Sequence, residues 1–423
     1  MTTARHDDYS ADTSPPTPRY LSLHHAKTGT RFRIFAQPRF IKFFSAPITV
    51  YLPARPGTIG EGPSDPDLYV VDAVNKRPYF DGLRESGQLP PYRGRRGRAA
   101  RPRNGHFDHI RPTGATARQF SSACLYATIR LTLAVWEHYL GARVRWYFRR
   151  DHRRLEVIPR VRARTAFSRP GYIECGFEGS RRSGRSYPLA ENFDVVSHEA
   201  GHLIVRSVIG HPSHPGGLEQ QAREEAFADL VAIVTLLHVQ PAVARLLSRT
   251  RGNLFSSNLL SRIGEISRTT VARRATNDRA MDTLEWDANP RAFRYELAAP
   301  FSGAGYGALV DLYETALVVR RAIPHRLADA SFDANGEMLP EVQREFERRY
   351  RGREAVFEDA LLEARDIFGH VLAQAWRRMT PYDSYPESLT AILTTARHLY
   401  GARTAGVIRE AFEWRGIPPE PTR

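Results

Sequence analysis

The amino-acid sequence predicts an α+β protein with a β-rich N-terminal lobe, a mainly helical C-terminal lobe and a pair of helices between them. Short β-like runs, separated by Pro/Gly-rich turns, fill the first half of the 423 residues. From Asn192 onward the apolar residues recur with helical spacing. Two or three lobes are expected at this length, and an apolar content of 42% is enough to bury a sizeable core.

One strongly amphipathic segment, Ser121 to Leu140, follows the first β-like runs and ends at Gly141, a typical helix terminator. Strands are expected at Arg31–Phe35, Ile48–Leu52, Leu68–Val74, Arg143–Phe148, Leu155–Val161 and Tyr172–Phe177. Helices in the second half are expected at 194–209, 219–239, 304–321, 342–350, 355–378, 386–399 and 403–413.

Composition divides the chain into four segments. Residues 1–19 are rich in Ser, Thr, Pro and Asp, and we expect them to be disordered. Residues 20–105 form a β-rich region that ends in an Arg/Gly-rich connector. Residues 106–245 hold the central helices, and residues 246–423 form the helical C-terminal lobe.

The net charge of +15 comes almost wholly from arginine, because lysine occurs only at positions 27, 42 and 76. A basic surface attracts nucleic acid or anionic lipid. No nucleic-acid motif accompanies the charge, so biased codon usage is the interpretation favoured here. The segment Arg93–Arg118 is the best place for a nucleic-acid contact, although a solvated loop is the more expected role for it.

Features of the sequence also bear on the compartment. Cys124 and Cys175 are too few for a disulfide framework or a four-thiolate metal site. The polar N-terminus does not resemble a signal peptide. The longest apolar run, Phe227–Val239, is too short to span a bilayer. We therefore expect a cytoplasmic protein without membrane contact, with export by a route without a cleaved signal as the alternative.

The most informative motif is HExxH, at His198-Glu199-Ala-Gly-His202. Helical spacing places the two histidines on one face, one turn apart, where they can bind one metal ion. Glu199 is rotated away from the ion but within reach of a water bound to it. The alternative is a buried helix with two hydrogen-bonded histidines.

A second predicted helix contains Arg223-Glu224-Glu225-Ala-Phe-Ala-Asp229. Glu225 and Asp229 are one turn apart among apolar residues, where a carboxylate is costly unless a cation or donor meets it. Glu225 is the candidate third ligand, with Glu224 as the alternative. Asp229 is the candidate acceptor for the outer N–H of a ligating histidine.

Two histidines and one carboxylate are a ligand set typical of a catalytic Zn²⁺ ion, because they leave a fourth position open for water. In that chemistry Glu199 is the general base that removes a proton from the water and passes it to the leaving amine. The sequence therefore predicts one zinc ion, held by His198, His202 and Glu225.

The segments DVVSHEAGH and EAFAD resemble the signature of the thermolysin-like zinc metallopeptidases, or gluzincins. The resemblance covers roughly residues 115–417 and implies a thermolysin-like catalytic fold with the active-site helix between its lobes. It also implies peptide or protein substrates, and assigns Glu199 as the base and Asp229 as the residue behind the first histidine.

Two further segments resemble the same family. Thr165-Ala166-Phe167 resembles its substrate-binding edge strand, although Thr165 replaces the usual asparagine. Tyr295 stands where the family has an oxyanion-stabilising histidine, so it is the candidate donor. The alternative donors are His211, His214 and His325.

Three functions compete on these observations. The leading hypothesis is a zinc metalloendopeptidase that cleaves extended peptides. The second is a regulatory peptidase with a single protein target. The third is a catalytically weakened zinc protein that acts as a binding module, with Arg93–Arg118 holding nucleic acid or a partner.

Overall fold

The computed structural model describes residues 17–80, 89–179, 186–214, 216–265, 271–275, 278–285, 287–334 and 339–421. The predicted disordered segment 1–19 therefore lies mostly outside the described residues. Arg19, at its end, pairs with Glu358 at 2.7 Å and with Asp359 at 2.5 Å.

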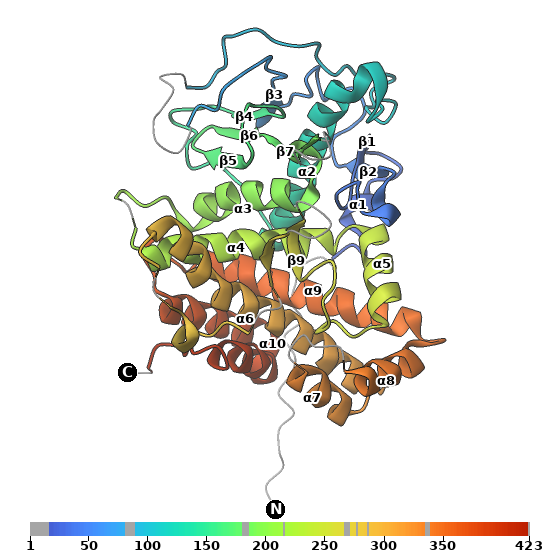
Figure 1. Cartoon of the computed structure of the whole chain (residues 1–423), viewed down its shortest axis with the longest axis vertical. Helices are drawn as coiled ribbons and strands as arrows, with labels where there is room; N and C mark the ends of the chain where they lie inside the picture. Colours follow the sequence, from blue (N-terminus) through green and yellow to red (C-terminus); the bar gives the residue numbers. More distant parts are fainter. Residues whose placement is uncertain are drawn as a thin grey trace, which may run out of the picture.

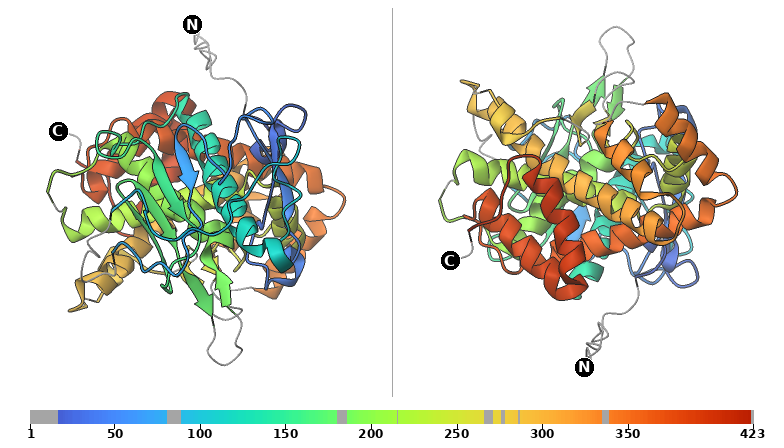
Figure 2. Two further views of the ribbon diagram at one scale, coloured as in Figure 1. Left: turned by 90° about the horizontal axis from the view of Figure 1, so that it is seen from above. Right: turned by 90° about the horizontal axis from the view of Figure 1, so that it is seen from below.

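The architecture is a mixture of small sheets and long helices. Most of the strands lie at the top of Figure 1, α3 and α4 cross the middle, and α6 to α10 lie below. Figure 2, right, shows the lower helices packed side by side. The strands are β1 Thr30–Ile34, β2 Ile48–Leu52, β3 Leu68–Val70, β4 Leu155–Ile158, β5 Ala166–Arg169, β6 Tyr172–Cys175, β7 Phe177–Gly179, β8 Ser186–Pro188, β9 Arg262–Glu265 and β10 Val271–Arg274. The α-helices are α1 Leu21–His24, α2 Ala117–Leu140, α3 Phe193–Ile209, α4 Leu218–Leu236, α5 Gln240–Thr250, α6 Pro290–Val319, α7 His325–Asp333, α8 Pro340–Tyr350, α9 Glu354–Trp376 and α10 Tyr385–Glu413.

The largest described sheet has four strands in the order β3-β4-β6-β5. Strands β3, β4 and β6 are parallel, and β5 pairs with β6 in the antiparallel direction. Because β5 is at the end of this order, one of its edges has no partner strand in the sheet. The remaining described strands form two-stranded pairs: β1 with β2, β7 with β8, and β9 with β10.

One large hydrophobic core joins the strands of the first half to the helices of the second. Helix α2 is almost entirely buried, and its Trp136 stacks on Trp376 of α9 with ring centroids 4.5 Å apart. Phe227 of α4 meets Trp376 edge-on at 5.6 Å. Residues from the N-terminal region join the same core, since Phe32 of β1 stacks on Tyr126 of α2. Helix α2 is thus packed between strand β1 and helix α9.

Several predicted elements differ from the structure. The predicted strand at 143–148 is wrong, because this segment is a loop and turn whose aromatic residues, Trp146 and Phe148, pack into the core without pairing to a strand. Helix α6 begins at Pro290 instead of 304 and continues through Pro300. Proline removes a helical hydrogen bond. The Tyr385 hydroxyl donates to the Leu297 carbonyl at 2.8 Å, which provides another hydrogen bond close to Pro300.

The predicted boundary between the last two helices is confirmed. The break predicted between 399 and 403 is present, because Gly401 interrupts α10 with φ 86°. Cys124 and Cys175 are both buried and unbonded. Among the described residues no single helix is long and apolar enough to cross a membrane, whereas one pair bent by 93°, Leu218–Leu236 with Gln240–Thr250, meets that test by length and composition.

A buried ion pair holds segment 71–80 against the sheet that carries β5. Lys76 Nζ donates to Glu174 Oε1 of β6 at 2.5 Å, and both side chains are at most 2% exposed. The Tyr79 N–H donates to Glu174 Oε2 at 2.8 Å. Burial raises the pKa of the Glu174 carboxyl and lowers the pKa of the Lys76 ammonium. The pair is therefore sensitive to the loss of either partner.

Lys76→Met is expected to lower the free energy of unfolding by about 3–5 kcal/mol, because it leaves the Glu174 carboxylate buried without its cation. The double variant Lys76→Met/Glu174→Gln should recover part of this loss, since the amide still accepts from Tyr79. Urea denaturation followed by circular dichroism measures both. A single variant as stable as the wild type would contradict this interpretation.

Candidate metal centre

Helix α3 presents His198 and His202 on one face. Asn192 caps its N-terminus by accepting from the Val195 N–H at 3.3 Å. The buried face, which includes Val196 and Leu203, packs into the core and fixes the rotation of the helix. The two imidazole rings are consequently adjacent, with centroids 4.6 Å apart.

Helix α4 approaches α3 closely enough to complete the set. A Cβ atom at Gly201, between the two histidines, would lie 3.0 Å from Val231 Cβ and 3.1 Å from Ala228 Cα of α4. The glycine therefore permits a tight helix contact, and this contact brings Glu225 opposite the histidines. His198, His202 and Glu225 form a group able to hold a metal ion.

The three ligand atoms have the separations that zinc requires. The two Nε2 atoms are 3.1 Å apart, and Glu225 Oε2 lies 3.4 Å from His198 Nε2 and 3.7 Å from His202 Nε2. Ligands placed about 2.0–2.1 Å from a tetrahedral zinc ion are about 3.3 Å from one another. The residues therefore fit Zn²⁺.

The outer nitrogens of both histidines face carboxylates. His198 Nδ1 lies 2.9 Å from Asp229 Oδ1, and His202 Nδ1 lies 2.8 Å from Glu224 Oε1. A carboxylate can only accept, so both Nδ1 atoms carry a proton, and in neutral imidazoles both Nε2 lone pairs then point inward. Two lone pairs and a carboxylate oxygen that converge in this way repel one another unless a cation lies between them.

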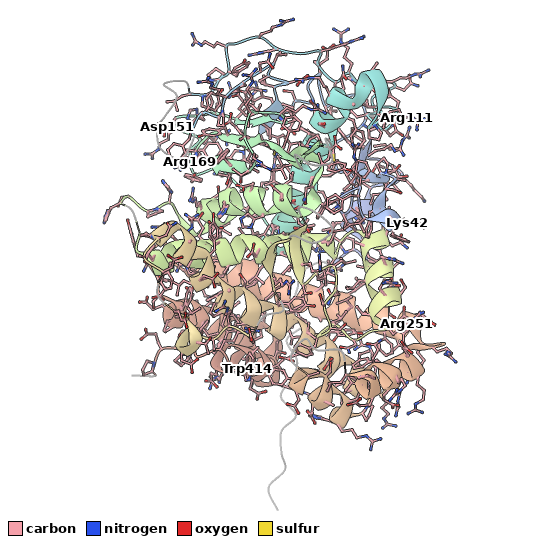
Figure 3. The ribbon with its side chains drawn as sticks, viewed as in Figure 1. Lys42, Arg111, Asp151, Arg169, Arg251 and Trp414 are labelled. Carbon is pink, nitrogen blue, oxygen red and sulfur yellow. The ribbon has the colours of Figure 1, made fainter. Side chains whose placement is uncertain are left out.

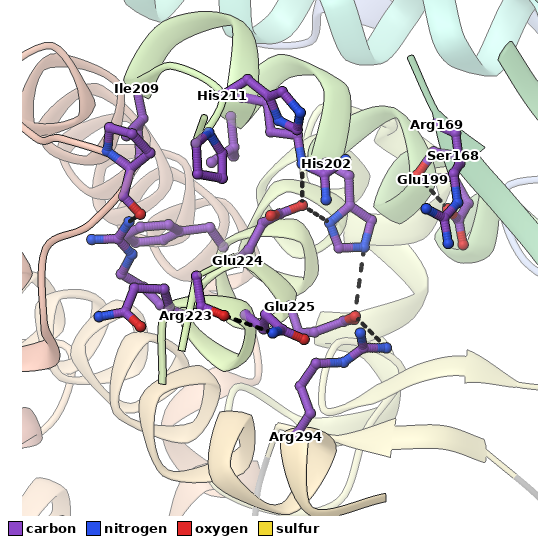
Figure 4. A pocket seen from close by; sticks show the side chains of 18 of the residues that line it. Ser168, Arg169, Glu199, His202, Ile209, His211, Arg223, Glu224, Glu225 and Arg294 are labelled. Atoms are coloured by element: carbon purple, nitrogen blue, oxygen red, sulfur yellow. Dashed lines mark hydrogen bonds and ion pairs between the residues drawn. The ribbon is translucent and has the colours of Figure 1, made fainter. Parts of the chain in front are cut away.

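These contacts separate the roles of the two adjacent glutamates. Glu224 lies behind His202 and also forms an ion pair with Arg206, whose Nε is 2.8 Å from Glu224 Oε1, so its carboxylate faces away from the ligand atoms. Burial alone would raise the pKa of Glu224, but the charge of Arg206 and the hydrogen bond with His202 hold it below its ordinary value. Glu225 is the carboxylate that converges with the two histidines, and Figure 4 shows its contact with His202.

Helix α6 supplies two outer contacts that the sequence did not predict. Arg294 approaches the second oxygen of Glu225, with Nη2 3.1 Å from Oε1. Ser302 donates to Asp229 Oδ2 at 3.2 Å. Each of the three ligands thus has a charged partner behind it. Both residues lie near Tyr295. The family resemblance was the only feature of the sequence that pointed to this segment.

The charges of the site also favour a divalent cation. With neutral histidines, the four carboxylates outnumber the two guanidinium groups that contact them, which leaves a net charge of −2. Buried unbalanced charge is costly, and a divalent ion removes the imbalance. The carboxylates are Glu199, Glu224, Glu225 and Asp229, and the guanidinium groups are Arg206 and Arg294.

A cleft of about 680 Å³ opens in front of the ligands. Glu199 lines it beside His198, and its carboxylate accepts from the Ser168 hydroxyl of β5 at 2.6 Å (Figure 4). Ser168 directly follows the predicted substrate segment 165–167, and its contact with Glu199 was not predicted from the sequence. The hydroxyl fixes the carboxylate at the wall of the cleft.

The predicted substrate segment also lines this cleft, through Thr165, Ala166 and Phe167. The Thr165 carbonyl accepts from the Gly176 N–H at 3.0 Å, so it points into the sheet, toward the end of β6. Main-chain groups alternate along a strand. The main-chain groups of Ala166 therefore point to the open edge of β5, where an extended peptide can pair with them.

The candidate oxyanion donors are distributed differently. Tyr295 lines the cleft, is 41% exposed and accepts a hydrogen bond from Arg294 Nη2 at 2.7 Å. His211 and His214 line the cleft as well, with His211 against the Tyr147 ring and His214 against the Tyr382 ring. His325 does not line it and pairs with Asp329 on the surface.

No family model matches the chain, and no curated protein matches its sequence. Among solved structures, the chain is similar to the precursor of protealysin, a metalloproteinase from Serratia proteamaculans. The identity is 11%, with 84% of this chain and 88% of the other covered and a TM-score of 0.48. A likeness at this level establishes neither family nor activity, so the assignment depends on the geometry of the site.

The purified protein is expected to bind one equivalent of zinc, which His198→Ala and Glu225→Ala abolish. Arg294→Ala should weaken zinc binding by about 10–100-fold, because the outer oxygen of Glu225 loses its partner. Competition with a chelator of known affinity measures this change. Arg326→Ala, an exposed arginine on α7, is the matched control. Equal zinc affinity for both arginine variants would refute the positioning role of Arg294.

Proposed function

We propose that the protein is a zinc metallopeptidase of the thermolysin-like, glutamate-liganded class that hydrolyses peptide bonds in extended substrates. The observation that carries the proposal is the three-ligand set at a cleft bounded by Glu199 and by the free edge of β5. A structural zinc site would instead be closed by four protein ligands.

Glu199 is the general base in this proposal. Zinc bound by the three ligands would polarise the scissile carbonyl and lower the pKa of a bound water. The Glu199 carboxylate takes the proton from the attacking water and delivers it to the leaving nitrogen. The hydrogen bond from Ser168 holds this carboxylate in place before the substrate binds.

The edge of β5 positions the substrate. A peptide that adds to this edge pairs with the main chain of Ala166 and runs past Glu199 and the ligands. Thr165 offers the substrate little, because its carbonyl accepts from Gly176 and its hydroxyl donates to the Ala166 carbonyl at 3.2 Å. Affinity therefore depends on main-chain pairing, which is tolerant of side-chain sequence.

Tyr295 is the donor to the oxyanion that we favour. Its hydroxyl accepts from Arg294, and the same guanidinium nitrogen lies 3.1 Å from Glu225 Oε1. Arg294 therefore links the tyrosine to the ligand set, and its positive charge polarises the phenol toward donation. The charge of Arg294 therefore supplies part of the positive charge that a tyrosine lacks relative to an imidazolium.

Glu199→Gln is expected to lower kcat for a peptide substrate by about 10²–10⁴-fold, because the amide cannot accept the proton. Zinc content should be unchanged, since Glu199 is not a ligand. Glu341→Gln, an exposed carboxylate on α8, is the control and should be fully active. A fully active, zinc-loaded Glu199→Gln enzyme would rule out the proposed mechanism.

Tyr295→Phe is expected to lower kcat by about 100-fold, with KM nearly unchanged, because the donor acts on charge that develops only in the transition state. Tyr382→Phe is a matched control: this tyrosine is also 41% exposed but bonds to Ser213. Steady-state kinetics on one fluorogenic peptide compares the two. If both variants keep wild-type kcat, Tyr295 is only a surface residue.

A further inference from the structure

The net positive charge is confined to one part of the chain. Residues 1–179 contain 30 Arg and Lys against 15 Asp and Glu, which gives the whole net charge of +15. Residues 180–423 contain 31 of each and are neutral. Biased codon usage would raise arginine in both parts without separating the charges, so it does not explain this partition.

Many of the exposed arginines in the first part form no ion pair with any described residue. They come from the connector, from the turn before β4 and from the segment after β4. These are Arg93, Arg95, Arg98, Arg103, Arg145, Arg149, Arg150, Arg153 and Arg162. Acidic residues in the same region are already engaged, as Glu61 is with Arg101, Asp67 with Arg143 and Asp72 with Arg118.

Backbone contacts join these segments into one surface, which we call the basic face. The Val74 N–H donates to the Arg95 carbonyl, and the Arg162 N–H donates to the Lys76 carbonyl, at 2.9 and 2.8 Å. Pro90 and Pro91 share a shallow hollow with Arg153. Figures 1 and 3 show this region at the end of the molecule farthest from the lower helices, with Arg111 and Asp151 near its two sides.

The chemistry of the basic face fits phosphate. Unpaired like charges on one surface repel one another, and an anion bound over them removes this repulsion. The planar guanidinium group matches phosphate oxygens and is the preferred partner for them. Leu89, at 60% exposure, is the one large hydrophobic side chain highly exposed among the described residues of these segments. A membrane-binding face would need more apolar area.

We propose that the basic face binds the phosphate backbone of nucleic acid. Arg169 ends β5 and lines the cleft beside Glu199 (Figure 4), and its guanidinium lies 4.1 Å from the ring centre of Phe80, in the segment 71–80 that is hydrogen-bonded to the basic face. Nucleic acid bound there would bring proteins that are attached to it to the peptidase site. Binding itself needs neither zinc nor catalysis, so it stands apart from the proposed peptidase activity.

The test is fluorescence anisotropy with labelled 20-nucleotide DNA, single-stranded and duplex, over a series of salt concentrations. Affinity should fall steeply with salt, by about tenfold or more for each doubling when four or more phosphates are neutralised. Arg95→Glu/Arg98→Glu/Arg153→Glu should weaken binding at least tenfold. Arg326→Glu/Arg344→Glu/Arg397→Glu, with the same charge change on exposed helical positions, should stay within twofold.

A second set, Arg145→Gln/Arg149→Gln/Arg150→Gln, changes the turn alone and guards against misfolding of the first variant. It should also lose affinity, whereas Glu199→Gln and chelator-treated protein should bind as the wild type does. Equal loss in the helical control would overturn the proposal, because it would indicate net charge instead of a site. Equal or tighter binding to phosphatidylserine vesicles or to polyglutamate would overturn it as well.

Discussion

The structure depends on the convergence of two imidazole nitrogens and one carboxylate oxygen, all within 3.1–3.7 Å of one another. Three acceptors at these separations repel unless a cation lies between them, so the fold has to hold them together. Helix α3 supplies two ligands, α4 supplies the third, and α6 supports them from behind with Ser302 and Arg294. The continuous core of α2, α4 and α9 stabilises this arrangement.

The helices and the sheet contribute different parts of the site. The helices hold the metal ligands, whereas the sheet provides the edge strand β5 and the hydroxyl of Ser168 that fixes Glu199. Strand β5 is held by β6, which the buried Lys76–Glu174 pair joins to segment 71–80. The stability of the sheet and the position of β5 at the cleft are therefore linked through this ion pair.

The grouping of His198, His202 and Glu225 could be predicted because it rests on spacing within helices. An i,i+4 pair of histidines shares a face whatever the rest of the chain does. Arg294 and Ser302 could not be predicted, because their approach depends on how α6 rotates against α4. The start of that helix was predicted too late, because Pro300 is a residue at which helices usually end or begin. The segment 143–148 was mistaken for a strand because its alternating apolar residues fit β-structure, but local pattern does not reveal whether a partner strand exists.

The most direct test of the account is anomalous diffraction at the zinc edge from crystals of the zinc-loaded protein. The account predicts one strong peak about 2.0–2.1 Å from His198 Nε2, His202 Nε2 and Glu225 Oε2, with Arg294 against the outer glutamate oxygen. A peak elsewhere, or a Glu225 side chain turned away from both histidines, would contradict it.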